Sequence, residues 1–464
     1  MQKAYEKYKE SGVEWIGNVP NHWEPIRLKF LGALYSGLSG KKGDDFRKED
    51  SEFNHNYIPF TNIANNFEID LEKLDSVEIF PDENQNQVEK NDLFFLMSSE
   101  NYDDIGKTAI LLDDTENTYL NSFCKGFRLF DNKDLDAKFL NYLLSGDVYR
   151  KILSIEAKGF TRINLQMGKI QNLPVVIPAS KMEQSKIAAF LDYHTTLIDS
   201  LIDKKEKLIE KLQEQRQAII NEAVTKGLNP GAELKDSRID WLGNIPKHWK
   251  FIKISSVAKQ NQYSITGGPF GSDLKNEEFT PEGVRIIQLQ NIGVGEFRDH
   301  YKIYTSEEKA DELFSCNIFP GDLIIAKMAD PVARACIMPD FDRRYIMASD
   351  GIRFEVNDEK VSSKFLEYAI NSKYFNFQAE LKSTGTTRLR IGLTEFKKLK
   401  LLLPPRAEQD IILEFLEGKD SSIKKSIDSI NISIQKLKEY RQSLISEAVT
   451  GKIDVRDWQK PNDS

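Results

Sequence analysis

The 464-residue chain contains one sequence pattern twice, and this repeat constrains its fold more than any other feature. Residues 11–23 read SGVEWIGNVPNHW and residues 237–249 read SRIDWLGNIPKHW, with seven identical residues at an offset of 226. Further matches follow at nearly the same offset. They are KFLNY with KFLEY, GFTRI with GTTRL, and EQSKIAAFLD with EQDIILEFLE. A repeat of this kind predicts two copies of one structural unit.

The identity between the copies is uneven along the chain. Residues 183–225 and 408–450 share 19 of 43 positions, whereas residues 32–137 and 258–363 hardly match. We interpret this as a duplication whose globular parts diverged; the alternative is drift on unconstrained surfaces. The expected domains are two globular modules at 1–180 and 236–405, and two helical spacers at 181–235 and 406–464.

Each module has the pattern of a mixed domain, so the expected fold class is α+β. Short β-rich runs bounded by Asn, Asp and Gly predict strands, among them DLFFLM (92–97), KTAILL (107–112), VRIIQLQNI (284–292) and GDLIIAKM (321–328). Helices are expected at 138–157 and 364–381. LPVVIP (173–178) and LKLLLPP (399–405) predict closing strands, because residues before proline favour extended backbone.

The spacers predict two long amphipathic helices. Residues 183–225 contain no Gly or Pro, and their apolar residues recur at intervals of three and four. Gly227, Pro230 and Gly231 should end the first helix. Two stripes of equal length most simply pair as an antiparallel coiled coil; alternatively, each helix docks on its own module. A helix over 187–223 would be about 55 Å long, more than one turn of DNA of about 34 Å.

Composition and motif searches exclude several classes of protein. No apolar run approaches the length of a membrane span, the first residues lack a signal-peptide pattern, and three cysteines make no disulfide framework. We therefore expect a soluble cytoplasmic protein. No dinucleotide fingerprint, P-loop, HExxH or nucleophile elbow is present, so neither a catalytic residue nor a metal site is expected. His22 and His248 recur beside tryptophans, which favours packing or hydrogen bonding over catalysis.

The repeated blocks resemble the specificity (S) subunits of type I restriction-modification systems. The resemblance covers residues 5 to about 455, including SGVEWIGNVPNHWEPIRLK, GTTRLRIGLTEFKKLKLLLPPRAEQ and LKEYRQSLISEAVTGKID. It implies two target recognition domains, each reading one half of a split double-stranded DNA site. It also implies paired helices that fix the spacing and dock two methyltransferase (M) subunits.

The same resemblance implies a non-catalytic subunit of a larger enzyme. Two restriction (R) subunits would add ATP-driven translocation and cleavage. The M subunits would flip an adenine on each strand out of the duplex and methylate its N6 atom. S-adenosylmethionine, ATP and magnesium would then be bound by the partner subunits, and no cofactor is expected here. The family supplies no short base-contact motif.

Candidate DNA-binding residues therefore come from side-chain chemistry: polar and basic residues in loops beside predicted strands. In the first module these are Lys41, Lys42, Arg47, Thr61, Asn62, Ser98, Ser99, Asn101, Tyr102, Lys125, Lys158, Thr161, Arg162 and Asn164. In the second they are Ser264, Thr266, Ser272, Lys275, Gln288, Gln290, Asn291, Lys327, Arg334, Arg343, Arg344, Ser349, Thr386, Thr387, Arg388 and Arg390.

The G-x-T-R element at 159–162 and 385–388 is the most specific of these candidates. Because it recurs in both modules, a phosphate contact suits it better than base reading. The alternative is a turn that only closes each module.

The net charge of −8 seems to oppose DNA binding, but it is unevenly distributed. Residues 66–116 hold 15 acidic and 3 basic side chains, whereas residues 382–400 hold six Lys or Arg and one Glu. We expect an acidic face on the first module, turned away from DNA or toward a partner. Two other hypotheses stay open: a coiled-coil adaptor with two protein-binding modules and no DNA recognition, and a nuclease or methyltransferase with diverged motifs.

Overall fold

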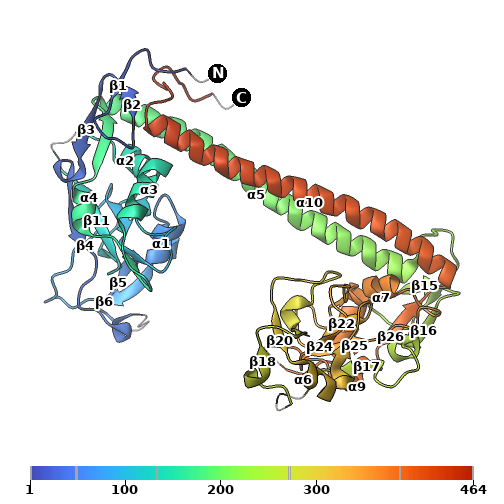
Figure 1. Cartoon of the computed structure of the whole chain (residues 1–464). Coiled ribbons are helices and arrows are strands. Elements are labelled where there is room, and N and C mark those ends of the chain that lie inside the picture. The colour runs from blue at the N-terminus through green and yellow to red at the C-terminus, as the bar shows by residue number, and fades with distance from the viewer. Residues whose placement is uncertain are drawn as a thin grey trace. The chain divides into compact units, whose positions relative to one another are not determined.

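The computed structural model describes residues 3–46, 51–131, 134–269, 271, 273–385 and 388–461. These residues form two compact units, and the boundaries between the units fall inside the two long helices. Unit 1 comprises residues 1–205 and 431–464, and unit 2 comprises residues 206–430. Each unit therefore contains one globular module together with a part of both helices (Figure 1).

The module of unit 1 contains thirteen strands and four α-helices among its described residues. The strands are β1 (Tyr8–Glu10), β2 (Asn18–Pro20), β3 (Trp23–Arg27), β4 (Gly32–Ser36), β5 (Asn54–Ile58), β6 (Asp75–Glu78), β7 (Leu93–Leu96), β8 (Ser98–Ser99), β9 (Thr108–Ile110), β10 (Thr118–Leu120), β11 (Cys124–Leu129), β12 (Ile163–Asn164) and β13 (Pro174–Pro178). The helices are α1 (Phe60–Asn65), α2 (Ala137–Ser145), α3 (Asp147–Glu156) and α4 (Met167–Gln171).

The module of unit 2 follows a similar order and differs in several short elements. Its strands are β14 (Leu234–Asp236), β15 (Asn244–Pro246), β16 (Lys250–Lys253), β17 (Ile265–Gly267), β18 (Phe279–Thr280), β19 (Val284–Ile287), β20 (Ile303–Thr305), β21 (Asn317–Ile318), β22 (Leu323–Ala326), β23 (Ala335–Ile337), β24 (Tyr345–Met347), β25 (Gly351–Phe354) and β26 (Lys400–Leu403). Its helices are α6 (Glu307–Glu312), α7 (Ser363–Ile370), α8 (Lys373–Leu381) and α9 (Leu393–Phe396).

Both modules are built on matching sheets. A four-stranded antiparallel sheet has the order β4-β11-β7-β9 in unit 1 and β17-β25-β22-β23 in unit 2. Beside it, a second sheet contains one parallel pair, β5 with β10 in unit 1 and β19 with β24 in unit 2. The inner strands β7 and β22 are buried along their whole length, which explains why both sequences are continuous apolar runs.

The divergent modules retain a repeated ion pair on this sheet. Arg128 Nη2 lies 2.7 Å from Asp92 Oδ2, and Arg353 Nε lies 2.6 Å from Asp322 Oδ2. Both aspartates are buried, so the arginines compensate a charge that would be costly alone. This pairing gives a structural reason for the matched patterns ND and GD at 91–92 and 321–322, and GFR and GIR at 126–128 and 351–353.

The long helices are α5 (Lys181–Lys226) and α10 (Arg406–Val449). In each unit their segments run antiparallel: Arg441 pairs with Asp199 at 2.9 Å in unit 1, and Arg216 pairs with Asp420 in unit 2. Gly227 follows α5 with φ of 73°, in agreement with the predicted helix end. The predicted pairing of the two helices is thus confirmed.

The helices are also fixed to the modules, through a repeated Glu-Gln pair in their first turns. Gln184 accepts from Asp136 N at 2.8 Å and donates to Pro178 O at 2.9 Å. Gln409 makes the matching contacts with Ser362 N at 3.1 Å and Pro404 O at 3.0 Å.

The preceding glutamates bind the tryptophan and histidine of the repeated opening sequence. Trp23 Nε1 donates to Glu183 at 3.1 Å, and His22 Nε2 lies 2.8 Å from the same carboxylate. Trp249 and His248 contact Glu408 in the same way, at 3.0 and 2.7 Å. We call these two clusters the helix junctions. The geometry supports the predicted hydrogen-bonding role of both histidines.

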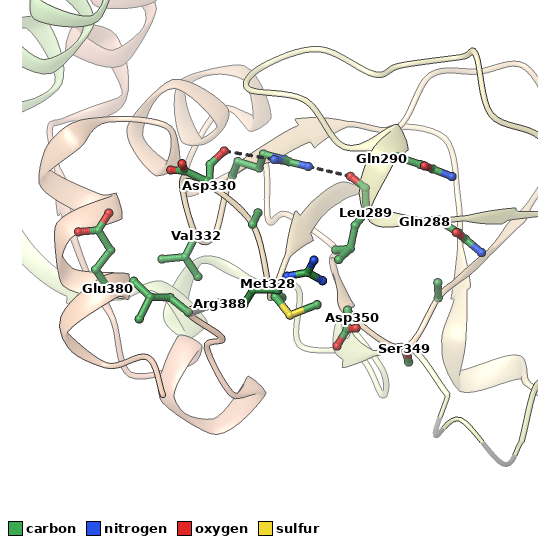
Figure 2. A pocket seen from close by; sticks show the side chains of 14 residues that line it. Gln288, Leu289, Gln290, Met328, Asp330, Val332, Ser349, Asp350, Glu380 and Arg388 are labelled. Carbon is green, nitrogen blue, oxygen red and sulfur yellow. Dashed lines mark hydrogen bonds between the residues drawn. The ribbon is translucent and has the colours of Figure 1, made fainter. Parts of the chain in front are cut away.

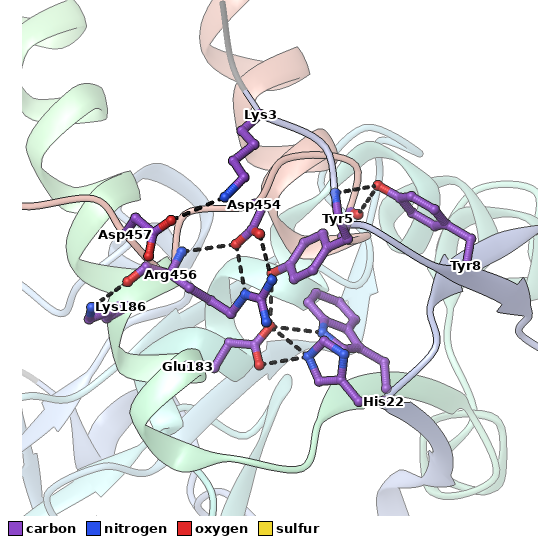
Figure 3. Close-up of polar contacts among 11 residues, drawn as sticks. Lys3, Tyr5, Tyr8, His22, Glu183, Lys186, Asp454, Arg456 and Asp457 are labelled. Atoms are coloured by element: carbon purple, nitrogen blue, oxygen red, sulfur yellow. Dashed lines mark hydrogen bonds and ion pairs between the residues drawn. The ribbon is translucent and has the colours of Figure 1, made fainter.

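The segments before β1 and after α10 extend the junction of unit 1 (Figure 3). Asp454 N donates to Lys3 O at 2.7 Å, and Arg456 pairs with Asp454 at 2.7 Å while lying over the Tyr5 ring. The Tyr5 hydroxyl in turn donates to Glu183 at 2.8 Å. Burial, followed by this hydrogen bond, raises the pKa of Tyr5, so the phenol stays protonated and keeps donating.

In the described ranges, no helix is apolar over a stretch long enough to cross a membrane.

The junctions generate a stability prediction. The Glu183 side chain is 7% exposed and contacts three side chains, those of Tyr5, His22 and Trp23, all of which lose this partner in Glu183→Ala. The Glu408 side chain is 25% exposed and has no tyrosine contact among the described residues. We expect a loss of about 3 kcal/mol in the free energy of unfolding for Glu183→Ala and about 1–2 kcal/mol for Glu408→Ala. Denaturant titration followed by tryptophan fluorescence measures both. Equal losses, or none, would contradict the role assigned to the carboxylates.

Candidate nucleic-acid interface

The G-x-T-R element lies in a hairpin in each unit, of which the structure describes residues 158–164 in unit 1 and residues 384–385 and 388–390 in unit 2. In unit 1, Lys158 and Asn164 exchange two backbone hydrogen bonds of 2.9 and 2.8 Å. In unit 2, Thr384 and Arg390 do the same at 3.0 and 2.9 Å. Paired backbone hydrogen bonds therefore close each hairpin.

The glycine of the element has a backbone reason. Gly159 has φ of 150° and Gly385 has φ of 105°. A Cβ atom on Gly159 would lie 1.9 Å from Arg162 O, and one on Gly385 would lie 2.4 Å from Arg388 O. Only glycine fits so tight a turn. The turn explains Gly159 and Gly385, but it does not explain why an arginine follows three residues later.

The hairpin of unit 1 gathers eight of the predicted residues on one surface. Strand β12 of the hairpin pairs with β8, and the Tyr102 hydroxyl donates to Gly159 O at 3.3 Å. The Arg162 guanidinium lies over the Phe123 ring, 4.2 Å from its centroid. The eight residues are Ser98, Ser99, Asn101, Tyr102, Lys158, Thr161, Arg162 and Asn164. We call this set the unit 1 edge.

The hairpin of unit 2 borders a cavity of about 870 Å³ (Figure 2). Five predicted residues line it: Gln288, Gln290, Arg334, Ser349 and Arg388. They come from the segment after β19, the segment after β22, the β24–β25 connection and the hairpin itself. Further lining residues, among them Met328, Asp330, Asp350 and Glu380, were not predicted. We call this set the unit 2 edge.

The cationic side chains around this cavity differ in the partners they bind. Arg334 donates to three backbone carbonyls, those of Ile292, Leu289 and Asp330, at 2.6, 3.0 and 3.2 Å. These contacts fix its guanidinium in the cavity wall.

Two of the other cations already have partners. Lys327 is buried and donates to Ser349 O at 2.9 Å; burial first, then the nearby Arg390, lowers its pKa. Arg390 pairs with Asp350 at 2.7 Å. Among the described residues, no acidic side chain pairs with Arg388, which leaves its guanidinium available to an anion.

Two predicted base readers have a structural role instead. Asn62 is buried; its Nδ2 donates to Asp70 O and Lys73 O, and its Oδ1 accepts from Asp70 N. Asn291 is also buried, and its amide binds three backbone groups in the matching loop of unit 2. Their hydrogen-bonding groups are used within the fold, so we no longer count them among the DNA-reading side chains.

The remaining predicted residues are scattered. Lys41 pairs with Glu83, Arg343 pairs with Glu307, and Arg344 pairs with both Glu307 and Asp311. Lys125 donates to the Ser36 hydroxyl at 3.0 Å, Ser264 is buried, and the Thr266 hydroxyl is buried without a partner in the described structure. Lys42, Thr61 and Lys275 are exposed and also lie outside the two edges. Arg47, Ser272, Thr386 and Thr387 lie outside the described residues.

Two exposed aromatic residues beside the unit 1 edge were missed. Phe160 and Phe123 are apolar, and a search restricted to polar and basic side chains passed over them. The signal for Phe160 was its place inside G-x-T-R. Within the described part of the chain, no group of three His, Cys, Asp or Glu side chains could hold a metal ion.

The loop asparagines generate a second stability prediction. Asn291→Ala leaves three backbone groups without their partner and should lower the free energy of unfolding by about 2 kcal/mol. Gln290→Ala, at the exposed neighbouring position, should change it by less than about 0.5 kcal/mol. Thermal or denaturant unfolding of both variants measures the difference. An unchanged stability of Asn291→Ala would return this residue to the DNA-reading candidates.

Comparison with known proteins assigns both modules to one protein family. The model of the type I restriction modification DNA specificity domain matches residues 20–211 and again residues 246–439. The chain is 24% identical over 457 residues to the specificity subunit of the type I restriction enzyme MjaVIII from Methanocaldococcus jannaschii, covering 97% of this chain and 98% of that one. It is 21% identical to the EcoKI specificity subunit of Escherichia coli K12, covering 96% and 92%.

Solved structures show the same fold. A chain from a type I R-M system superposes with a TM-score of 0.69 at 14% identity, covering 94% of this chain and 99% of that one. The HsdS subunit from Thermoanaerobacter tengcongensis gives 0.50 at 15% identity, covering 94% and 98%. The two matched domains span most of the sequence, and the chain belongs to the family of type I restriction-modification DNA specificity proteins.

Proposed function

We propose that the chain is the specificity subunit of a type I restriction-modification complex and that it reads a bipartite site in double-stranded DNA. The observation that carries this proposal is the pair of edges. Each edge includes a hairpin whose turn requires glycine, and an arginine of that hairpin has no acidic partner among the described residues. The side chains around this arginine differ between the two modules. Shared arginines suit phosphate contacts, and differing neighbours suit two different half-sites.

The proposal assigns the chemistry to partner subunits. Two M subunits would carry S-adenosylmethionine and methylate adenine N6, and two R subunits would use ATP and magnesium. Exposed apolar side chains on the long helices are consistent with protein docking. They are Met182, Leu197, Leu201, Ile432 and Tyr440 in unit 1, and Leu208, Ile411 and Phe415 in unit 2.

Methylation sequencing tests the proposed function directly. DNA from cells that express the chain with its M subunit should carry one split motif, with an adenine modified on each strand. The modification should vanish when this chain is omitted. A single contiguous motif would contradict the bipartite reading. A stable complex with M that shows no sequence-specific DNA retardation would instead favour the adaptor hypothesis.

The hairpin arginines generate a prediction about salt. Arg388→Ala in the complex with M should weaken binding to specific and nonspecific duplexes alike and reduce the slope of log K against log salt by about 1. Arg162→Ala should act similarly in unit 1. Arg238→Ala removes an exposed charge of unit 2 outside the edge and serves as the control. Fluorescence anisotropy over a salt series measures the slope; an unchanged slope for Arg388→Ala would sink the phosphate assignment.

A further inference from the structure

Phe160 is the most exposed large apolar side chain of unit 1 among the described residues. A single exposed apolar residue needs no explanation in itself, because protein surfaces commonly contain them. The setting of Phe160 is what makes it informative. It lies in the loop of the unit 1 hairpin, directly after Gly159 and two residues before Arg162.

The loop that carries Phe160 is held in a defined conformation. The Lys158–Asn164 hydrogen bonds close it, the Gly159 backbone fits only glycine, and Tyr102 binds the Gly159 carbonyl. The aromatic ring is therefore presented by a preorganised tip rather than by a loose chain, which lowers the entropy lost on binding.

The charges beside Phe160 favour a nucleic acid as the occupant. Lys158 and Thr161 are exposed, and Arg162 lies over Phe123. Within the described residues, neither Lys158 nor Arg162 has an acidic partner. In the described structure, an exposed apolar ring thus lies between two cations without acidic partners, and apolar side chains of this kind insert between base steps in proteins that kink DNA.

The repeat distinguishes DNA from a protein partner. The two hairpins share Gly159 with Gly385, Thr161 with Thr387 and Arg162 with Arg388, but Phe160 corresponds to Thr386. A protein docked equally on both modules would meet like residues at this position. Two modules that read different half-sites are expected to differ there, which is what the sequences do.

We infer that Phe160 is a wedge that inserts its ring at a base step of the half-site read by unit 1, while Lys158 and Arg162 contact the flanking phosphates. The inference rests on the proposed function and adds a mode of reading to it. Partial unstacking costs least at flexible pyrimidine–purine steps, so the wedge would contribute sequence preference without a hydrogen bond to any base. It would act in one half-site only, because the second hairpin has threonine there.

The test uses the complex with M and a duplex carrying the split site identified by methylation sequencing. 2-Aminopurine is placed at successive positions of each half-site, and its fluorescence reports unstacking. The wild-type complex should raise the signal at one step of the unit 1 half-site beyond any signal from the methylated bases. Phe160→Ala should abolish that rise and weaken specific binding roughly 5- to 150-fold, the range for loss of one stacked base. Its salt slope should not change.

Matched variants separate the ring from its surroundings. Phe160→Trp should keep most of the signal, whereas Phe160→Leu should keep part of it. Phe130→Ala, at another exposed phenylalanine of unit 1, should behave as wild type. Circular dichroism and thermal unfolding should show no loss of stability for Phe160→Ala, since its ring is fully exposed.

Each contrary outcome has a distinct meaning. Specific binding by the wild-type complex without a Phe160-dependent fluorescence change would overturn the wedge and leave the proposed function standing. Failure of Phe160→Ala to assemble with M in size-exclusion chromatography would make Phe160 a protein contact and also overturn the wedge. Absence of specific DNA binding by the wild-type complex would overturn both.

Discussion

The repeated carboxylate at the start of each long helix is the interaction on which the architecture depends. Glu183 and Glu408 accept from a fully buried tryptophan and contact a histidine of the same opening motif. The next residue in each helix, a glutamine, binds backbone groups of the same module. Two adjacent side chains thereby fix the direction in which each helix leaves its module. The negative charge of the glutamate also stabilises the helix, because it lies near the positive end of the helix dipole. The residues whose side chains make these contacts are identical in the two copies of the repeat.

The sequence predicted the architecture because architecture depends on features that repeat or have a period. The helix starts at Lys181 and Arg406, the apolar runs of β7 and β22, and the roles of His22 and His248 all follow from such patterns. The edges were harder. Asn62 and Asn291 resemble base readers in sequence, and only the fold shows that their amides already bind nearby backbone groups.

The same limit applies to charge and to apolar residues. Lys41 and Arg344 are paired with acids 42 and 37 residues away in sequence, and no local pattern reports such pairs. Phe160 was missed for a different reason: direct readout uses polar side chains, so the sequence criteria did not include apolar ones. The acidic segment 66–116 also looks different once folded. Several of its carboxylates neutralise cations of their own unit, in the pairs Glu68–Lys138, Glu83–Lys41, Asp92–Arg128, Asp104–Lys107 and Asp114–Lys90.

The hairpin has a consequence for how such a chain can change. In unit 1 the closure uses backbone hydrogen bonds and Gly159, and the Phe160 side chain is exposed, so folding places almost no demand on residue 160. The sequence has phenylalanine at 160 and threonine at the matching position 386. A mutation at that position alters the surface offered to a ligand while leaving the stability of the module nearly untouched. If the module reads DNA as proposed, single substitutions at residue 160 would change its recognition without a loss of stability.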